Sequence, residues 1–258
     1  MKKFILSSII GGIVVIIYSL SLLYNLSNSK ISTNNSKSVV LPDFNSIKII
    51  TQFKNINIET SPDNSAHLLF DKKTNEKFDY KISNNQLLVK ESSKKYSNFF
   101  ANTSNSNYVT IQIPKSSIIN DITIDSYISN ISIKDQKLSS IKIIQDTGDI
   151  TILNSNCMHG EIRTKIGDLI TKNTKLSNFK ININTGDWEA TSLNILENVQ
   201  FYANLGDSNI TLSEEAAKDI KLTTSSKFGD SVIKPYIKNT SEKNHLIIRV
   251  RTGDIVVK

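Results

Sequence analysis

Cysteine, proline, histidine and arginine are all scarce in this chain. Its 258 residues include one cysteine, four prolines and three histidines. A single cysteine cannot form an intrachain disulfide, so the hydrophobic core has to supply the stability. Cys157 has only His159 close to it in the sequence, in an expected connecting turn. We therefore predict that Cys157 packs as a small structural residue and is not a nucleophile.

Glycine is scarce as well, but its distribution is regular. Six of the nine glycines are followed directly by aspartate, in steps of 19, 19, 20, 23 and 24 residues. A period in this range is typical of a solenoid or an array. Asn130, which lies 19 residues before Asp149, marks a degenerate first turn. The pairs are Gly148-Asp149, Gly167-Asp168, Gly186-Asp187, Gly206-Asp207, Gly229-Asp230 and Gly253-Asp254.

The residues around each Gly-Asp pair alternate between apolar and polar. Apolar residues or threonine recur five residues and one residue before the glycine, and mostly also two and four residues after it. Such alternation, rich in β-branched residues, predicts short strands with one buried face. Glycine suits a corner between strands because it adopts positive φ without steric cost. Aspartate suits it because its carboxylate accepts hydrogen bonds from nearby backbone N–H groups.

These patterns predict an all-β fold, a parallel β-solenoid (β-helix-like) of about seven ~20-residue turns. The Gly-Asp repeats occupy residues 121–258, and stacking of successive turns closes the core. Residues 43–120 alternate without the repeat, and we expect them to form an N-terminal β region that caps the first turn. One helical turn, at residues 213–218, is expected inside the repeats.

The N-terminus has the pattern of a membrane anchor. Lys2 and Lys3 precede an apolar run from Phe4 to about Leu26 that contains no charge. About 20 apolar residues cross a bilayer, and no Ala-x-Ala-like cleavage site follows the run. We predict a transmembrane signal-anchor at residues 1–26, with a cleaved signal peptide as the alternative, and a flexible Asn- and Ser-rich tether at 27–42. The lysines predict a single-pass cell-membrane protein whose C-terminal domain is extracellular.

The column of aspartates raises the question of a cation site. Calcium-binding β-rolls need a Gly-Gly-x-Gly-x-Asp run every nine residues, whereas the repeats here supply one aspartate per ~20 residues and no Gly-Gly. Charges about 5 Å apart cost only about 1 kcal/mol in water, which turn N–H groups and nearby lysines can offset. We predict structural corners and no metal site, with a Ca²⁺-stabilised module as the alternative.

Catalytic groups are not gathered anywhere in the sequence. Polysaccharide-active β-helix enzymes need clustered carboxylates with a basic residue at one cleft. Here Arg163 is expected about four turns away from Arg249 and Arg251, and the three histidines lie in separate segments. We predict a non-enzymatic protein without a cofactor, and keep a polysaccharide-active enzyme as a further alternative.

Two other segments are candidates for contacts. The polar stretch at residues 94–100 places two lysines beside Tyr96, Phe99 and Phe100, which suggests contact with a membrane surface or a partner, or else a cap on the solenoid end. The chain ends on a strand, residues 255–258, which we expect to be an open edge available for self-association. The net charge of +7 is scattered, with no basic patch interleaved with aromatics, so we predict no binding to nucleic acid.

The corners also carry a resemblance. They are Thr147-Gly-Asp-Ile-Thr-Ile152, Ile166-Gly-Asp-Leu169, Thr185-Gly-Asp-Trp188 and Thr252-Gly-Asp-Ile255, with the strand Ile111-Gln-Ile-Pro114 ahead of them. Over residues 43–258 the chain resembles the putative-adhesin β-strand-repeat family of unknown function, found in Gram-positive envelopes and including LiaG-type proteins of envelope-stress operons. The resemblance implies a repeat architecture and supplies no catalytic residues. The function we expect is that of a membrane-anchored adhesin or envelope-stress accessory, whose partner is an envelope protein or a wall polymer.

Overall fold

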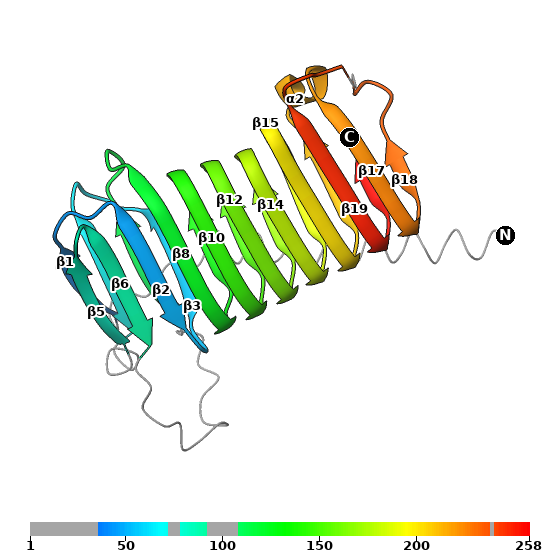
Figure 1. Cartoon of the computed structure of the whole chain (residues 1–258). Helices are drawn as coiled ribbons and strands as arrows, with labels where there is room; N and C mark the ends of the chain where they lie inside the picture. The colour runs from blue at the N-terminus through cyan, green and yellow to red at the C-terminus, as the bar shows by residue number, and fades with distance from the viewer. Residues whose placement is uncertain (1–35, 72–77, 92–107, 238–239) are drawn as a thin grey trace. The chain divides into compact units, whose positions relative to one another are not determined.

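The computed structural model describes residues 36–71, 78–91, 108–237 and 240–258 (Figure 1). The predicted anchor at 1–26, most of the predicted tether, and Tyr96, Phe99 and Phe100 lie outside these ranges. In the described part, no helix is long and apolar enough to cross a membrane. Residues 37–258 form one compact unit, and it is all-β apart from the short helix α2 (Glu214–Lys218), so the predicted all-β class is confirmed.

Each solenoid turn contributes one long and one short strand, and the long strands form what we call the long-strand sheet. Neighbouring long strands pair in parallel with a constant offset, so that Ile143 lies beside Ile162 and Ile162 beside Ile181. The long strands of the central turns are β8 (Ile119–Ile128), β10 (Lys137–Thr147), β12 (Asn156–Ile166), β14 (Lys175–Thr185) and the second half of β15 (Trp188–Leu205).

The short strands form a second parallel sheet, the short-strand sheet. Its central members are β9 (Ile131–Lys134), β11 (Ile150–Leu153), β13 (Leu169–Lys172), the first half of β15, and β16 (Ser208–Leu212). The core lies between the two sheets. Trp188 is fully buried there, with its ring centroid 5.1 Å from that of Phe201 and the two planes tilted by 39°, and it donates its indole N–H to the Thr171 hydroxyl at 3.2 Å.

The burial predicted from the alternation is wrong at one position, the residue directly before the glycine. The residues five before the glycine are buried as expected in most turns, but the residue directly before it is not. Ile166, Leu205 and Phe228 are 54%, 52% and 59% exposed. Each is the last residue of its long strand, beside the corner where the chain leaves that sheet. The short strands begin only after the corner, so they do not cover it.

The order of the last two turns is also inverted relative to the chain. The structure pairs β15 with β19 (His245–Thr252), and β19 in turn with β17 (Lys221–Phe228) (Figure 1). In the short-strand sheet, β20 (Ile255–Val257) lies between β16 and β18 (Ser231–Ile233). The prediction that the C-terminal strand is an open edge is therefore wrong, because β20 is paired on both sides. The described end of the ladder is the turn β17–β18.

Side-chain polarity explains this inversion. The turn β19–β20 carries Ile248, Val250 and Ile255 at inward positions, and all are buried. The turn β17–β18 carries Thr224, Ser226 and Ser231 at the matching positions. Placing the apolar turn inside the stack and the polar turn at its end lowers the apolar area left in water. Terminal repeats of solenoids have this polar character.

The N-terminal strands continue both sheets. In the long-strand sheet, β2 (Ser46–Thr51) lies between β8 and β6 (Gln86–Glu91), and in the short-strand sheet β3 (Asn55–Thr60) lies between β9 and β7 (Tyr108–Ile113), all in parallel. Two further turns thus precede the seven that the sequence predicts. Beyond them, β5 (Phe78–Ser83) and β4 (Ala66–Asp71) pair antiparallel with β6 and β7, and β1 (Ser36–Leu41) pairs with β4.

Candidate functional site

All six Gly-Asp pairs lie at one corner of the solenoid, where backbones of successive turns approach closely. The glycines have φ between 126° and 151°. A Cβ built on Gly167 would lie 2.0 Å from the carbonyl oxygen of Gly148, and one on Gly186 would lie 2.1 Å from that of Gly167. Both the backbone angle and the close approach therefore require glycine.

The aspartates form a hydrogen-bonded column that joins one turn to the next. Asp149 Oδ1 accepts the backbone N–H of Asp168 at 2.9 Å, and Asp168 Oδ1 accepts that of Asp187 at 2.8 Å. The same bond continues from Asp187 to Asp207, from Asp207 to Asp254, and from Asp254 to Asp230. Asn55 and Asn130 fill the equivalent positions at the N-terminal end of the column, with amide oxygens as acceptors.

Charge accumulates along this aspartate column. Desolvation by the neighbouring turns raises the pKa of Asp168, and the charges of Asp149 and Asp187 raise it further, against the lowering effect of the Asp187 N–H. Partial burial also raises the pKa of Glu189, with the charges of Asp168 and Asp187 adding to it. Across the described ranges, no group of three or more His, Cys, Asp or Glu residues is arranged to hold a metal ion.

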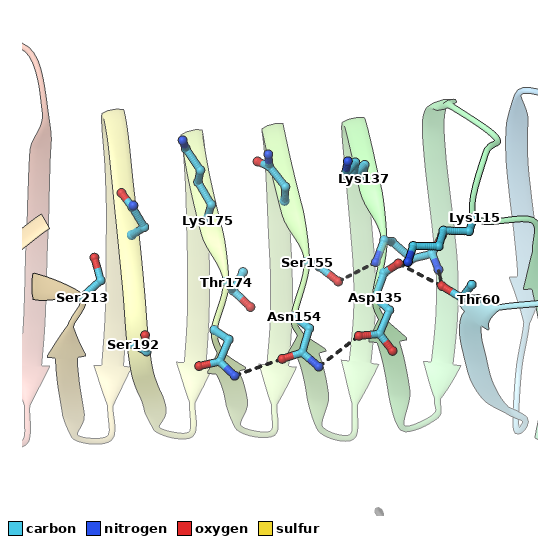
Figure 2. A pocket seen from close by; sticks show the side chains of 14 residues that line it. Thr60, Lys115, Asp135, Lys137, Asn154, Ser155, Thr174, Lys175, Ser192 and Ser213 are labelled. Atoms are coloured by element: carbon cyan, nitrogen blue, oxygen red, sulfur yellow. Dashed lines mark hydrogen bonds between the residues drawn. The ribbon is translucent and has the colours of Figure 1, made fainter. Parts of the chain in front are cut away.

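A second polar column, which the sequence did not reveal and which we call the asparagine column, lies at the other end of the short strands. Asn154 Nδ2 donates to Asp135 Oδ1 at 3.0 Å, and Asn173 Nδ2 donates to Asn154 Oδ1 at 3.0 Å (Figure 2). Asp135, Asn154, Asn173 and Ser192 all have positive φ, between 48° and 57°. The spacing of 19 residues between these four positions is the signal that could have revealed the column.

A polar groove of about 700 Å³ runs beside this second column (Figure 2). Ser155 and Thr174 are buried at its base and donate to the backbone carbonyls of Leu153 and Lys172. Lys137 and Lys175 occupy the first position of their long strands and line the groove together with the asparagine column. Its lining thus contains amides, hydroxyls and ammonium groups at the spacing of the turns, together with the carboxylate of Asp135.

A second groove, of about 630 Å³, lies on the outer face of the long-strand sheet, and we call it the basic groove. Its lining includes all three arginines of the chain, so the prediction that Arg163 is about four turns from the other two is wrong. The row of paired residues runs from Arg163 through Asn182 and Tyr202 to Arg249, so only three turns separate Arg163 from Arg249. The inverted order of the last turns places Arg249 beside Tyr202.

Contacts within the basic groove hold some of its side chains. Arg249 Nη1 donates to the Tyr202 hydroxyl at 2.9 Å, and its guanidinium carbon lies 5.5 Å from the centroid of that ring. Near the other end, Lys165 pairs with Asp146 at 2.7 Å and Arg163 with Glu161 at 2.6 Å. These surface pairs order the side chains but contribute little to stability.

Groups with catalytic chemistry stay apart in the described ranges. Cys157 is fully buried, and burial raises its pKa to about 12, so its thiol is not a nucleophile at neutral pH. His67 contacts Asp63 at 2.9 Å, a bond that lowers the pKa of Asp63. His67, His159 and His245 lie on different strands, β4, β12 and β19.

These features define a parallel two-sheet β-solenoid with hydrogen-bonded corner columns and grooved surfaces. The chain belongs to the Toastrack DUF4097 family, whose profile matches residues 44–226 and 129–258. This membership confirms the resemblance drawn from the Gly-Asp corners at the level of the family. None of the curated proteins compared with the chain matches it.

Several solved structures are similar in fold. One is a putative adhesin from Bacteroides fragilis, with a TM-score of 0.57 and 15% identity, over 86% of this chain and 96% of that one. A putative lipid binding protein from Parabacteroides distasonis has a TM-score of 0.47 and 12% identity, over 87% and 97% of the two chains. A putative adhesin from the same organism has a TM-score of 0.46 and 11% identity, over 86% and 95%. At these identities the likeness concerns the fold alone.

Proposed function

We propose that this chain is a membrane-anchored, non-enzymatic surface protein that holds an envelope partner on its solenoid. The observation that carries the proposal is the polar groove beside the asparagine column (Figure 2). Its amides Asn154 and Asn173 stand on consecutive turns, and Lys137 and Lys175 on alternate turns, so they present a repeated set of donors and acceptors to a partner. A wall polymer, with its many hydroxyl groups, suits such a surface better than an apolar ligand does.

A non-enzymatic role agrees with how the carboxylates are used. In the aspartate column, Oδ1 of each residue from Asp149 to Asp254 accepts a backbone N–H of the next turn, which is a structural use. The Bacteroides fragilis structure described as a putative adhesin has the same fold, which fits a surface role. The apolar run at residues 4–26 supports a single-pass anchor with the solenoid outside the cell.

Retention by the cell envelope tests this function. Residues 37–258 contain the described strands and core, and would be immobilised and exposed to solubilised envelope, with proteins and wall polymers measured separately. We expect retention of an envelope component, and a clear reduction for Lys137→Ala combined with Lys175→Ala. The control is Lys134→Ala combined with Lys172→Ala, which removes two exposed lysines of the short-strand sheet. Failure to retain any envelope component would contradict the proposal.

A further inference from the structure

The basic groove is built from two outward positions of the long strands. They lie four residues and two residues before the glycine of each Gly-Asp pair. The first row runs in spatial order through Ile144, Arg163, Asn182, Tyr202, Arg249 and Ser225. The second row, two residues further along each strand, contains Asp146, Lys165, Asn184, Asn204, Arg251 and Lys227, all of which line the groove. Both rows cross the strands, so the groove follows the direction in which the turns stack.

Positive charge dominates this groove. Its lining has five cationic side chains, Arg163, Lys165, Lys227, Arg249 and Arg251, and one carboxylate, Asp146. Asp146 is already paired with Lys165. In the parts of the chain that the structure describes, Arg249, Arg251 and Lys227 form no ion pair, although all three are exposed. The nearest carboxylates along the chain, Asp254 and Asp230, belong to the aspartate column beyond the corner.

We propose that the basic groove binds a linear polyanion whose negative charges are phosphodiesters. Arginine guanidinium groups present paired N–H donors that match phosphate oxygens, and here two of them stand two residues apart on one strand. Asn204 Nδ2 donates to Asn184 Oδ1 at 2.7 Å, so the polar groups between the cations are ordered. Arg249 lies over the Tyr202 ring and donates to its hydroxyl, so its guanidinium is held in the groove.

The shape of the site favours a polymer chain over a membrane surface. The cations line an elongated groove, which admits a chain, whereas a bilayer needs a flat or convex face that carries apolar side chains. The exposed Ile166, Leu205 and Phe228 lie beside the corner and do not line the groove. This inference rests on the proposed function in that it names the chemistry of one envelope partner, but it concerns a different face of the solenoid.

Binding of defined polymers tests the inference. The full chain in neutral detergent would be titrated with synthetic poly(glycerol phosphate), with dextran as the neutral polymer. We expect binding to poly(glycerol phosphate) that weakens with added salt, and no binding to dextran. Arg249→Gln combined with Arg251→Gln should weaken binding about tenfold to a hundredfold, because each lost guanidinium removes charge-assisted hydrogen bonds. The charge-matched control, Lys134→Gln with Lys172→Gln, should change it less than about twofold.

Each outcome bears on the inference. Arg249→Lys with Arg251→Lys keeps the charge, so it should retain more affinity than the glutamine pair, which also checks that loss does not come from misfolding. Equal binding by wild type and glutamine variants would overturn the inference, and so would preferential binding to micelles that contain an anionic lipid. Retention by the envelope without binding to poly(glycerol phosphate) would sink this inference and leave the proposed function standing. Binding to poly(glycerol phosphate) without retention of any envelope component would contradict the proposed function and leave this inference standing.

Discussion

The carboxylate of Asp168 accepts the backbone N–H of Asp187, one solenoid turn away, at 2.8 Å. The sequence predicts that the aspartate side chain stabilises its own corner, whereas in the structure it bonds to the next turn of the stack. The bond repeats along the column with distances of 2.7 to 2.9 Å. Its effect is to fix the spacing of the turns at the corner where no room is left for a Cβ.

Replacing this acceptor should destabilise the stack. Asp168→Ala leaves the Asp187 N–H without its partner, and we expect a loss of about 1 kcal/mol in the free energy of unfolding. Asp168→Asn keeps an amide oxygen in place and removes the repulsion from Asp149 and Asp187, as Asn130 does naturally in the same column. It should be neutral or stabilising. Urea unfolding of the two variants checks this, and an equal loss in both would contradict the role assigned to the hydrogen bond.

The raised pKa values of Asp168 and Glu189 predict a dependence of stability on pH. A carboxyl group whose pKa is higher in the folded state binds more protons when folded, so stability falls as pH rises between the unfolded and folded pKa values. The ordinary values are 3.8 and 4.5, so these two groups favour the fold at about pH 4, near those values, over pH 7. We expect the difference in Tm between pH 4 and pH 7 to become smaller in Asp168→Asn combined with Glu189→Gln. An unchanged difference would show that these groups do not cause it.

Two glycines should differ in how their substitution can be rescued. Gly186→Ala places a Cβ 2.1 Å from the carbonyl oxygen of Gly167, at a φ of 144°, and should cost about 3 kcal/mol or more. Gly160→Ala places its Cβ 2.0 Å from the Phe179 ring, and this glycine has no positive φ. Phe179→Leu should therefore recover part of the stability lost in Gly160→Ala, whereas no side-chain change should rescue Gly186→Ala. Thermal unfolding of the single and double variants measures both effects.

Calcium should not change the stability of the fold. The aspartates use Oδ1 to accept backbone N–H groups, and in the described ranges no cluster is suited to a metal ion. We expect the same Tm in the presence of millimolar Ca²⁺ and in EDTA. A rise of several degrees with Ca²⁺ that disappears on Asp187→Asn would instead support the Ca²⁺-stabilised module.

Much of the fold was readable from the Gly-Asp period, because a corner with positive φ and no room for a Cβ tolerates little besides glycine. The asparagine column was missed because Asn154, Asn173 and Ser192 are ordinary polar residues. Their 19-residue spacing is visible only when the repeats of this chain are aligned with one another. The basic groove was missed for another reason. Its residues come from strands that chain order separates, and only the inverted pairing brings Arg249 beside Tyr202. Thr224, polar where the other turns carry isoleucine or phenylalanine, was the available sign of a terminal turn.

The inverted strand order can be tested by cross-linking. Gln200 lies beside Ile247 in the ladder, and Ile247 lies beside Thr223, so Gln200 and Thr223 are two strands apart. Neighbouring strands are about 4.8 Å apart, within the range of a disulfide, whereas two strands span about 10 Å. Gln200→Cys with Ile247→Cys should therefore form a disulfide under mild oxidation, and Gln200→Cys with Thr223→Cys should not. Cys157 is buried and does not interfere. If only the second pair cross-linked, the turns would stack in chain order, and Arg249 would no longer lie beside Tyr202 in the basic groove.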